Sequence, residues 1–209
     1  MENLLSGEIS FAKKEYEGAV ESFEKVISLT GDDYLRYRAY HTSDEIFRII
    51  NKPERSVELL SSAMNRLPIN RVPEMTERLA DAYVKCGDYQ NAIALFEKLL
   101  ETGAPQFHIM QNLAILLQSM DQLDRAADLL SKMADEFPND YRVPMRQTYL
   151  EADRQSKIAN EDRDYSTTQQ YYGRAVDLYN KNVKPGNSDP EMQQLDNIIG
   201  QLRSEGWIE

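Results

Sequence analysis

The chain has 209 residues, of which 41% are hydrophobic and 28% are charged, a composition that can bury a core in water. A net charge of −11 argues against binding to nucleic-acid phosphates, which requires a basic stripe. The longest apolar run, Leu113 to Leu117, is far below the roughly 20 residues of a membrane span. The N-terminus, MENLLSGEIS, lacks the apolar core of a secretory signal, so we expect a cytoplasmic protein with no nucleic-acid or membrane partner.

The first predicted pair of helices covers about residues 1–32. In EYEGAVESFEKVI (15–27), Ala19, Phe23 and Val26 recur at the spacing of one face of an amphipathic helix. Gly7 lies in the helix before it. Because two helices approach to about 8–10 Å only where the contacting side chains lack bulk, we expect Gly7 to be a contact point.

The second pair, about residues 33–70, follows the same register with apolar residues at Tyr40, Phe47, Leu60 and Ala63. It departs from the first pair at both small positions. Asp44 stands where the first pair has Gly7, and Ser56 stands where it has Ala19. The small site of the second helix recurs at residues 19, 56, 92 and 126, so spacings of 37, 36 and 34 indicate extra residues in the early turns.

The third and fourth pairs, about residues 72–105 and 106–140, repeat most regularly. DYQNAIALFEKLL (88–100) aligns with QLDRAADLLSKMA (122–134) at an offset of 34 residues, which places Ala92 on Ala126 and Phe96 on Leu130. The helices before them, 75–89 and 109–123, carry Ala80 and Ala114 at the small position and break near Gly87 and Asp121.

The fifth pair, about residues 141–184, is predicted to have a longer first helix, from Arg142 to Arg163, and a second helix over 164–181. A capping helix follows over 188–206. Ser188 or Asp189 can serve as its N-cap with Pro190 at the first helical position, and Gly206 can take the left-handed stop conformation, so that Trp207 or Ile208 folds back on the last turn.

These features together resemble the tetratricopeptide repeat, a helix–turn–helix of 34 residues. The matching features are the small residues of both helices, the turn aromatics Tyr16 and Tyr89, and a closing proline at Pro68 and Pro138, with Pro105 one residue later. The resemblance implies an all-α fold, a single right-handed α-solenoid of about five helical hairpins with a C-terminal capping helix. Residues 164–208 also resemble, more weakly, repeat modules attached to some bacterial serine/threonine protein kinases.

The resemblance further implies that the first helix of each hairpin, helix A, lines a concave wall on which a peptide or protein segment lies. Projection of the non-packing face of each helix A gives a candidate groove of Glu8, Phe11, His41, Glu45, Arg48, Glu77, Asp81, Val84, Gln111, Ile115 and Gln118. Its carboxylates predict an acidic groove for a basic or mixed-charge peptide. They argue against the C-terminal carboxylates of heat-shock chaperones as ligands, because like charges repel. A solvated acidic surface without a binding role is the alternative interpretation.

No catalytic pattern appears in the sequence. His41 and His108 are isolated, glycines are scattered, and no HExxH, CxxC, GxSxG or phosphate loop is present, so we expect no enzyme, cofactor or metal site. Cys86, the single cysteine, is predicted to be a semi-buried structural thiol. The predicted function is therefore a protein-interaction scaffold. The alternative is a regulatory adaptor in a larger, possibly kinase-containing, protein that acts by self-association or tethering.

Overall fold

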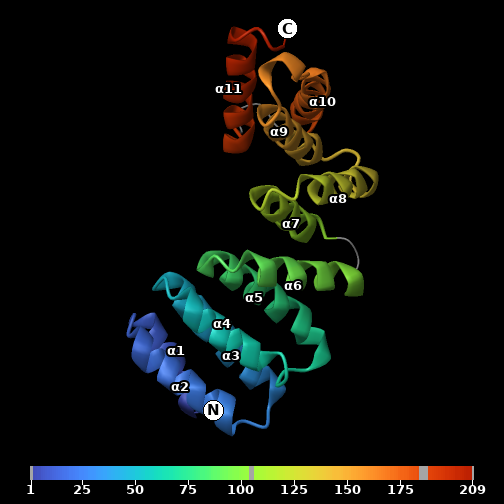
Figure 1. Ribbon diagram of the computed structural model, residues 1–209. Coiled ribbons are helices and arrows are strands. Elements are labelled where there is room, and N and C mark those ends of the chain that lie inside the picture. The colour runs from blue at the N-terminus through green and yellow to red at the C-terminus, as the bar shows by residue number, and fades with distance from the viewer. Residues whose placement is uncertain (1, 104–105, 184–187, 209) are drawn as a thin grey trace. The chain divides into compact units, whose positions relative to one another are not determined.

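A computed structural model describes residues 2–103, 106–183 and 188–208 of the chain, and every regular element in these ranges is helical (Figure 1). The predicted all-α class is confirmed. The helices are α1 (Glu2–Ala12), α2 (Tyr16–Leu29), α3 (Asp33–Ile49), α4 (Pro53–Ala63), α5 (Val72–Cys86), α6 (Tyr89–Thr102), α7 (Phe107–Ser119), α8 (Leu123–Glu136), α9 (Arg142–Ser156), α10 (Ser166–Asn182) and α11 (Pro190–Ser204), with 3₁₀ turns η1 (Ile69–Arg71) and η2 (Asn160–Asp162).

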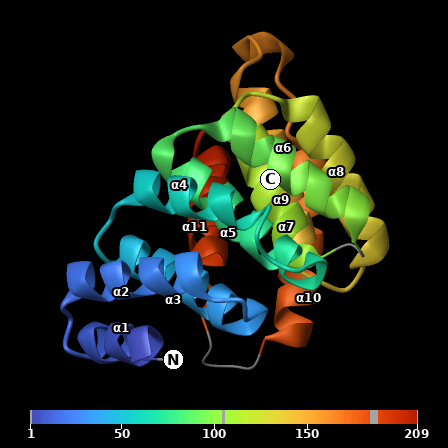
Figure 2. The same ribbon diagram turned by 90° about the horizontal axis from the view of Figure 1, so that it is seen from below.

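The chain divides into two compact units, Met1–Ala104 (unit 1) and Pro105–Glu209 (unit 2). In unit 1 each of the helices α1 to α5 packs against the next one along the chain, which ends the series at α6, and Figure 2 shows α1, α2 and α3 side by side. In unit 2, α7 to α10 pack in the same consecutive way, and α11 packs against α9. Continuity of one array through residues 104–105, with Pro105 as a closing residue, lies outside the described residues and stays a prediction.

Small residues mark the points of closest helix contact, as expected. The side chains of Ala19, Ala80, Ala92 and Ala126 are fully buried. Gly7 is the tightest case, because a Cβ added there would lie 2.7 Å from Cε1 of Phe23, which is itself fully buried. The absence of a side chain at position 7 therefore allows the backbone of α1 to lie directly against the Phe23 ring of α2.

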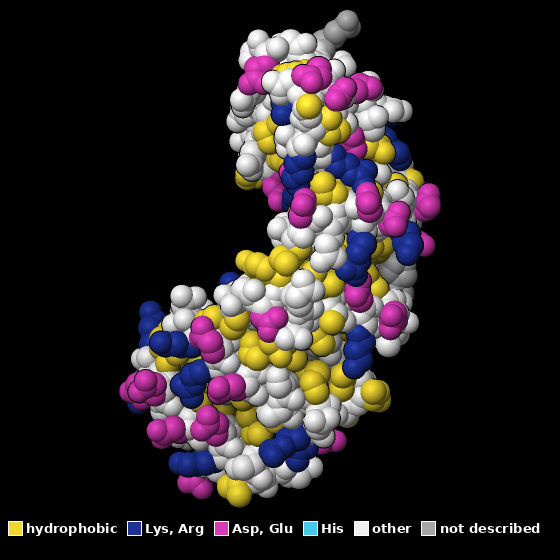
Figure 3. All heavy atoms as spheres, viewed as in Figure 1, with side chains coloured by type: hydrophobic (Ala, Val, Ile, Leu, Met, Phe, Trp, Pro, Cys, Tyr) yellow, Lys and Arg dark blue, Asp and Glu magenta, His cyan; other side chains and the backbone are white. Residues whose placement is uncertain are grey.

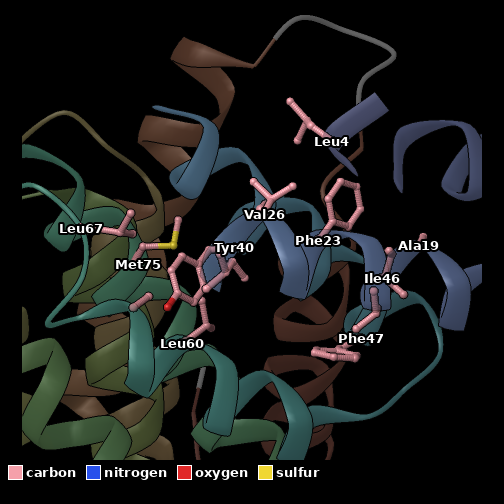
Figure 4. Packing of buried hydrophobic residues seen from close by; sticks show 14 of the residues in the cluster. Leu4, Ala19, Phe23, Val26, Tyr40, Ile46, Phe47, Leu60, Leu67 and Met75 are labelled. Atoms are coloured by element: carbon pink, nitrogen blue, oxygen red, sulfur yellow. The ribbon is translucent and has the colours of Figure 1, made fainter. Parts of the chain in front are cut away.

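The core of unit 1 is one continuous hydrophobic cluster to which all of α1 to α5 contribute. Figure 4 shows Leu4 and Val26 near Phe23, and Tyr40 close to Leu60 and Met75. Tyr40 is fully buried, and its hydroxyl makes a hydrogen bond of 3.0 Å with Ser62 Oγ. The aromatic residues that recur at the repeat spacing, Phe23, Tyr40 and Phe47, thus pack in the core.

One left-handed residue separates the two helices of each of the first four hairpins. Lys14, Asn51, Gly87 and Asp121 have φ values of 63°, 53°, 76° and 59°. At each turn this residue and the next donate their N–H groups back to the last turn of helix A, for example Gly87 to Val84 and Asp88 to Tyr83. Each turn residue lies five positions before the small site of helix B, so the added residues of the early hairpins are not in these turns. They lie in the 17-residue helix α3 and in the connection through η1.

The first helix of the fifth hairpin is shorter than the sequence predicts. The expected helix from Arg142 to Arg163 is wrong beyond Ser156, where α9 ends and η2 follows. The guanidinium of Arg163 donates hydrogen bonds to the carbonyls of Ser156 and Ile158, each 3.0 Å long. A side chain that satisfies these carbonyls stabilises the helix end.

The capping helix α11 forms as predicted. Asp189 is its N-cap and accepts a 2.8 Å hydrogen bond from the N–H of Glu191. Gly206 has a φ of 79°, and Trp207 donates its N–H to the carbonyl of Leu202. The Trp207 ring then contacts Tyr165, with ring centroids 5.8 Å apart. A buried cluster that α11 shares with α9 and α10 comprises Met145, Ala175, Met192, Leu195 and Ile199.

Candidate functional site

Unit 1 holds the first part of the predicted groove on helices α3 and α5, and its charges are more balanced than the sequence predicts. Glu8 of α1 pairs with Arg38, and Asp44 pairs with Arg78 at 2.6 Å between Oδ2 and Nη1. On the face of the molecule that Figure 3 shows, Lys and Arg side chains are interspersed with Asp and Glu side chains over unit 1. The candidate list includes neither Arg38 nor Arg78. Arg38 precedes His41 by three positions and Arg78 precedes Asp81 by three, so helical periodicity could have placed both arginines on the candidate face.

Glu74 is the centre of a hydrogen-bonded cluster between α3 and α5. Both of its carboxylate oxygens accept from the Tyr37 hydroxyl at 2.9 Å, and Arg71 and Arg78 lie within 4.0 Å. The Arg71 guanidinium also stacks over the Tyr37 ring, 4.4 Å from its centroid. Burial and the hydrogen bond to Glu74 raise the pKa of Tyr37, so its hydroxyl remains a donor near neutral pH.

His41 belongs to the same cluster. Its Nε2 contacts Nη2 of Arg78 and lies 3.8 Å from Glu74. Burial and then the positive charge of Arg78 lower the pKa of His41, with the nearby carboxylates acting in the opposite direction. Because a guanidinium can only donate, Nε2 must accept, which fixes a neutral ring at this position.

Arg48 and Asp81 line a small pocket among α3, α4 and α5. Asp81 is partly buried, and desolvation raises the pKa of its carboxyl while Arg48 opposes that shift. Arg78, Lys85, Asp44 and Ser56 also line this pocket. The sequence placed Arg48 and Asp81 on one wall, and the structure brings them together.

Other candidates in unit 1 differ in their surroundings. Phe11 is partly buried, packs against the hydrophobic core and contacts Tyr16 with ring centroids 6.2 Å apart. Glu45 is an exposed carboxylate, whereas Glu77 and Val84 are half-buried.

Unit 2 contains an open groove among α7, α9 and α11 with a volume of about 640 Å³. Two predicted residues, Ile115 and Gln118, line it, and Gln111 lies one turn before Ile115 on the same helix. The projection from the sequence missed the other lining residues, which come from the end of α7 and the turn after it, from α9 and its C-cap, and from α11. They are Ser119, Asp121, Tyr149, Ala152, Asp153, Ser156, Lys157 and Ile198.

Apolar and polar groups are segregated within this groove. Ile115 is 38% exposed, and the groove side chains of Ala152 and Ile198 are also aliphatic. At the polar side, Lys157 Nζ lies 2.5 Å from Asp121 and 3.1 Å from Asp153. An aliphatic surface next to two carboxylates and one amine suits a peptide that carries both an apolar and a basic residue.

Among the residues that the structure describes, no group of three or more His, Cys, Asp or Glu side chains could hold a metal ion. Cys86 is exposed rather than semi-buried, so its expected structural role is wrong. Cys86 is the last residue of α5, and partial desolvation there, together with the negative charges of Glu54 and Asp88, raises the pKa of its thiol, so the reactive thiolate is disfavoured. No helix in the described ranges combines the length and apolarity needed to cross a membrane.

Comparisons with known proteins agree with this architecture. Residues 3–33 and 83–143 match models of the tetratricopeptide repeat. The chain, with its paired helices and small contact residues, is a tetratricopeptide repeat protein. No curated protein sequence matches it.

Several solved structures share the fold. MamA is 16% identical with a TM-score of 0.68, over 90% of this chain and 95% of that one. A tetratricopeptide repeat protein from Parabacteroides merdae is 15% identical with a TM-score of 0.70, over 97% and 74%. YrrB, described as having an unusual peptide-binding site, is 13% identical with a TM-score of 0.63, over 86% of each chain. At these identities the likeness concerns the fold.

Proposed function

We propose that this protein is an interaction module that binds an extended peptide segment of a partner protein. The groove of about 640 Å³ among α7, α9 and α11 is the observation that carries the proposal. Its size falls within the usual range of about 300–1,000 Å³ for ligand sites, and the exposed Ile115 provides an apolar anchor. The peptide-binding site described for YrrB supports the same use of the fold.

The partner segment carries basic or mixed charge in this proposal. In unit 1, Glu45 is exposed on α3, and in unit 2 two carboxylates flank Lys157. The arginines of unit 1 are largely engaged with carboxylates of the same wall, which leaves a mixed surface rather than a uniformly acidic one.

A C-terminal carboxylate clamp does not fit this surface. Arg78 is the basic residue nearest to the places that such a clamp needs, and it is already held by Asp44, His41 and Glu74. Its guanidinium has little capacity to take a further carboxylate. We also assign no catalytic step to the chain. The alternative role as an adaptor tethered to a larger protein stays a prediction.

A peptide-array screen tests the charge preference. We expect the peptides retained by the protein to be enriched in Lys or Arg together with an aliphatic residue, and we expect retention to weaken as salt rises. Asp153→Lys in the groove lowers retention of the basic peptides, whereas Asp128→Lys, a matched change at an exposed aspartate on α8 that does not line the groove, leaves it unchanged. Equal effects of the two variants would contradict the proposed charge preference.

A further inference from the structure

The polar end of the groove in unit 2 lies where two helices end. Asp153 lines it from the last turn of α9, and Lys157 lines it from the C-cap of the same helix. Asp121 lines it from the left-handed turn that follows α7. The C-terminal end of a helix carries a partial negative charge, so the ends of α7 and α9 both favour a positive group here.

One ammonium group, that of Lys157, joins these elements. Its Nζ lies 2.5 Å from Oδ1 of Asp121 and 3.1 Å from Oδ2 of Asp153, so it donates to a carboxylate of each element. The groove lining in the described residues carries these two carboxylates and this one cation. Asp121 and Asp153 therefore form a site for one ammonium group, which a lysine of the same chain occupies.

This arrangement limits how a basic peptide can use the groove. A second ammonium group placed beside Lys157 would meet a like charge, and both carboxylates already accept hydrogen bonds from Lys157. A basic side chain of the peptide thus gains the full attraction of the two carboxylates only where Lys157 has left them.

The contacts of Lys157 are weak enough to be exchanged. The side chains of Lys157 and Asp121 are 44% and 73% exposed, and ion pairs exposed to this degree contribute little stability in water. A peptide lysine that arrives together with an aliphatic residue also brings apolar surface to the exposed Ile115, which Lys157 cannot supply.

The geometry favours lysine over arginine as the incoming residue. Two carboxylates from different elements converge on one nitrogen atom, which suits the compact charge and three donors of an ammonium group. A guanidinium is planar and donates best to both oxygens of a single carboxylate.

We propose that Lys157 is an internal competitor, which in the free protein occupies the place of a lysine ammonium of the bound peptide; this inference rests on the proposed peptide-binding function. On binding, the peptide lysine donates to Asp121 and Asp153, and the side chain of Lys157 turns to solvent. The exchange itself gains little, because one ammonium group replaces another. Binding therefore requires the aliphatic residue as well, and Lys157 excludes peptides that carry basic charge alone.

Lys157→Met and Lys132→Met form a matched pair for a binding test. Each removes one positive charge, but Lys132 is exposed on α8 and does not line the groove. Fluorescence anisotropy is measured with the best-retained lysine-containing peptide. We expect Lys157→Met to bind it about three- to tenfold more tightly than the wild type, and Lys132→Met to show a smaller gain. Equal gains in the two folded variants, or weaker binding by Lys157→Met, would overturn the proposal.

Two altered peptides separate competition from other effects of Lys157→Met. With methionine in place of the peptide lysine, the gain should disappear; a gain that persists would arise from the new apolar side chain and would overturn the competitor role. With serine in place of the aliphatic residue, the peptide should bind Lys157→Met and not the wild type. Rejection of this peptide by both proteins would overturn the role of Lys157 in excluding it.

Butylammonium tests the ammonium site in the absence of any peptide. It is titrated into ¹⁵N-labelled wild type and Lys157→Met, and amide chemical shifts near residues 121 and 153 are followed by nuclear magnetic resonance. We expect saturable shifts, with an affinity at least about threefold higher in Lys157→Met, and none with neutral 1-pentanol. Equal affinities in the two proteins, or equal shifts from the two probes, would overturn the proposal.

The two experiments together separate this inference from the proposed function. Tighter butylammonium binding by Lys157→Met with no retained peptide supports the ammonium site and overturns the peptide-binding function. Peptide binding in the groove that Lys157→Met leaves unchanged overturns the competitor role and leaves the peptide-binding function in place.

Discussion

Gly7→Ala tests whether helix packing in the first hairpin depends on a missing side chain. The new Cβ would lie 2.7 Å from Cε1 and 3.0 Å from Cδ1 of Phe23, closer than two carbon atoms can pack. Phe23 is fully buried, so its ring can move only by displacing the surrounding core. Overpacking of this kind costs about 1–3 kcal/mol, whereas Ala in place of Gly within a helix gains about 1 kcal/mol. We expect a net loss of up to about 2 kcal/mol.

Gly18→Ala is the matched control on the partner helix. The Cβ added at Gly18 would meet only Ser10 Oγ at 4.0 Å, so helix propensity alone acts and stability rises by up to about 1 kcal/mol. Urea unfolding of the whole chain, followed by far-ultraviolet circular dichroism, measures both shifts. Phe23→Leu should partly rescue Gly7→Ala, since Leu130 fills the corresponding place in the fourth hairpin. Stabilisation by Gly7→Ala equal to that of Gly18→Ala would refute the close contact.

Three further predictions concern the turns, the histidine and the cap. Lys14 has a left-handed backbone with a φ of 63°, which Gly adopts without strain, so Lys14→Gly should raise the free energy of unfolding in urea by about 0.5–1 kcal/mol. Lys13→Gly at the neighbouring residue should lower the free energy of unfolding by a similar amount. The pKa of His41 is lowered in the folded state, so its contribution to stability is complete above its ordinary pKa of about 6.5 and is lost as pH falls through the lower folded value. Unfolding free energies measured from pH 7.5 to 5 should fall less in His41→Gln, and an identical pH profile would contradict this. Trp207→Ala removes a ring that contacts Tyr165 and should lower the stability of the C-terminal cap by about 1–3 kcal/mol. The expected sign is faster amide hydrogen exchange in α11, and unchanged exchange would show that the packing of Trp207 on Tyr165 contributes nothing.

The hairpins and the cap could be predicted because local physics determines them. Small residues at helix contacts, such as Ala92 and Ala126, recur at a regular spacing, so the repeats can be aligned from the sequence. Asp189, Pro190 and Gly206 act within a few residues of their own position, where capping preferences are strong. These features require no knowledge of distant contacts.

The length of α9 could not be predicted in the same way. Residues 157–163 are mostly polar and include neither Gly nor Pro, so their sequence is compatible with a continued helix. What stops the helix is the return of Arg163 to the carbonyls of Ser156 and Ile158, and the contact of the Arg163 guanidinium with the Trp207 ring about forty residues later. Such a contact belongs to the tertiary structure.

The character of the candidate site was predicted only in part. Projection onto single helices identified exposed carboxylates, but the charge of a wall depends on which side chains from neighbouring helices meet. Arg78 reaches back from α5 to Asp44 of α3, which is buried. The groove of unit 2 likewise depends on α11, which contributes Ile198 to its lining, whereas sequence periodicity assigns that helix to capping alone.

A binding titration at two matched isoleucines tests the central claim most directly. Ile115 lines the groove of unit 2 and is 38% exposed, and Ile158 is 39% exposed in the segment after α9 but does not line the groove. Fluorescence anisotropy of the best-retained peptide is measured against the wild type, Ile115→Arg and Ile158→Arg. We expect Ile115→Arg to weaken binding about tenfold or more and Ile158→Arg to leave it unchanged. Equal affinities for all three folded proteins would show that the peptide does not occupy this groove.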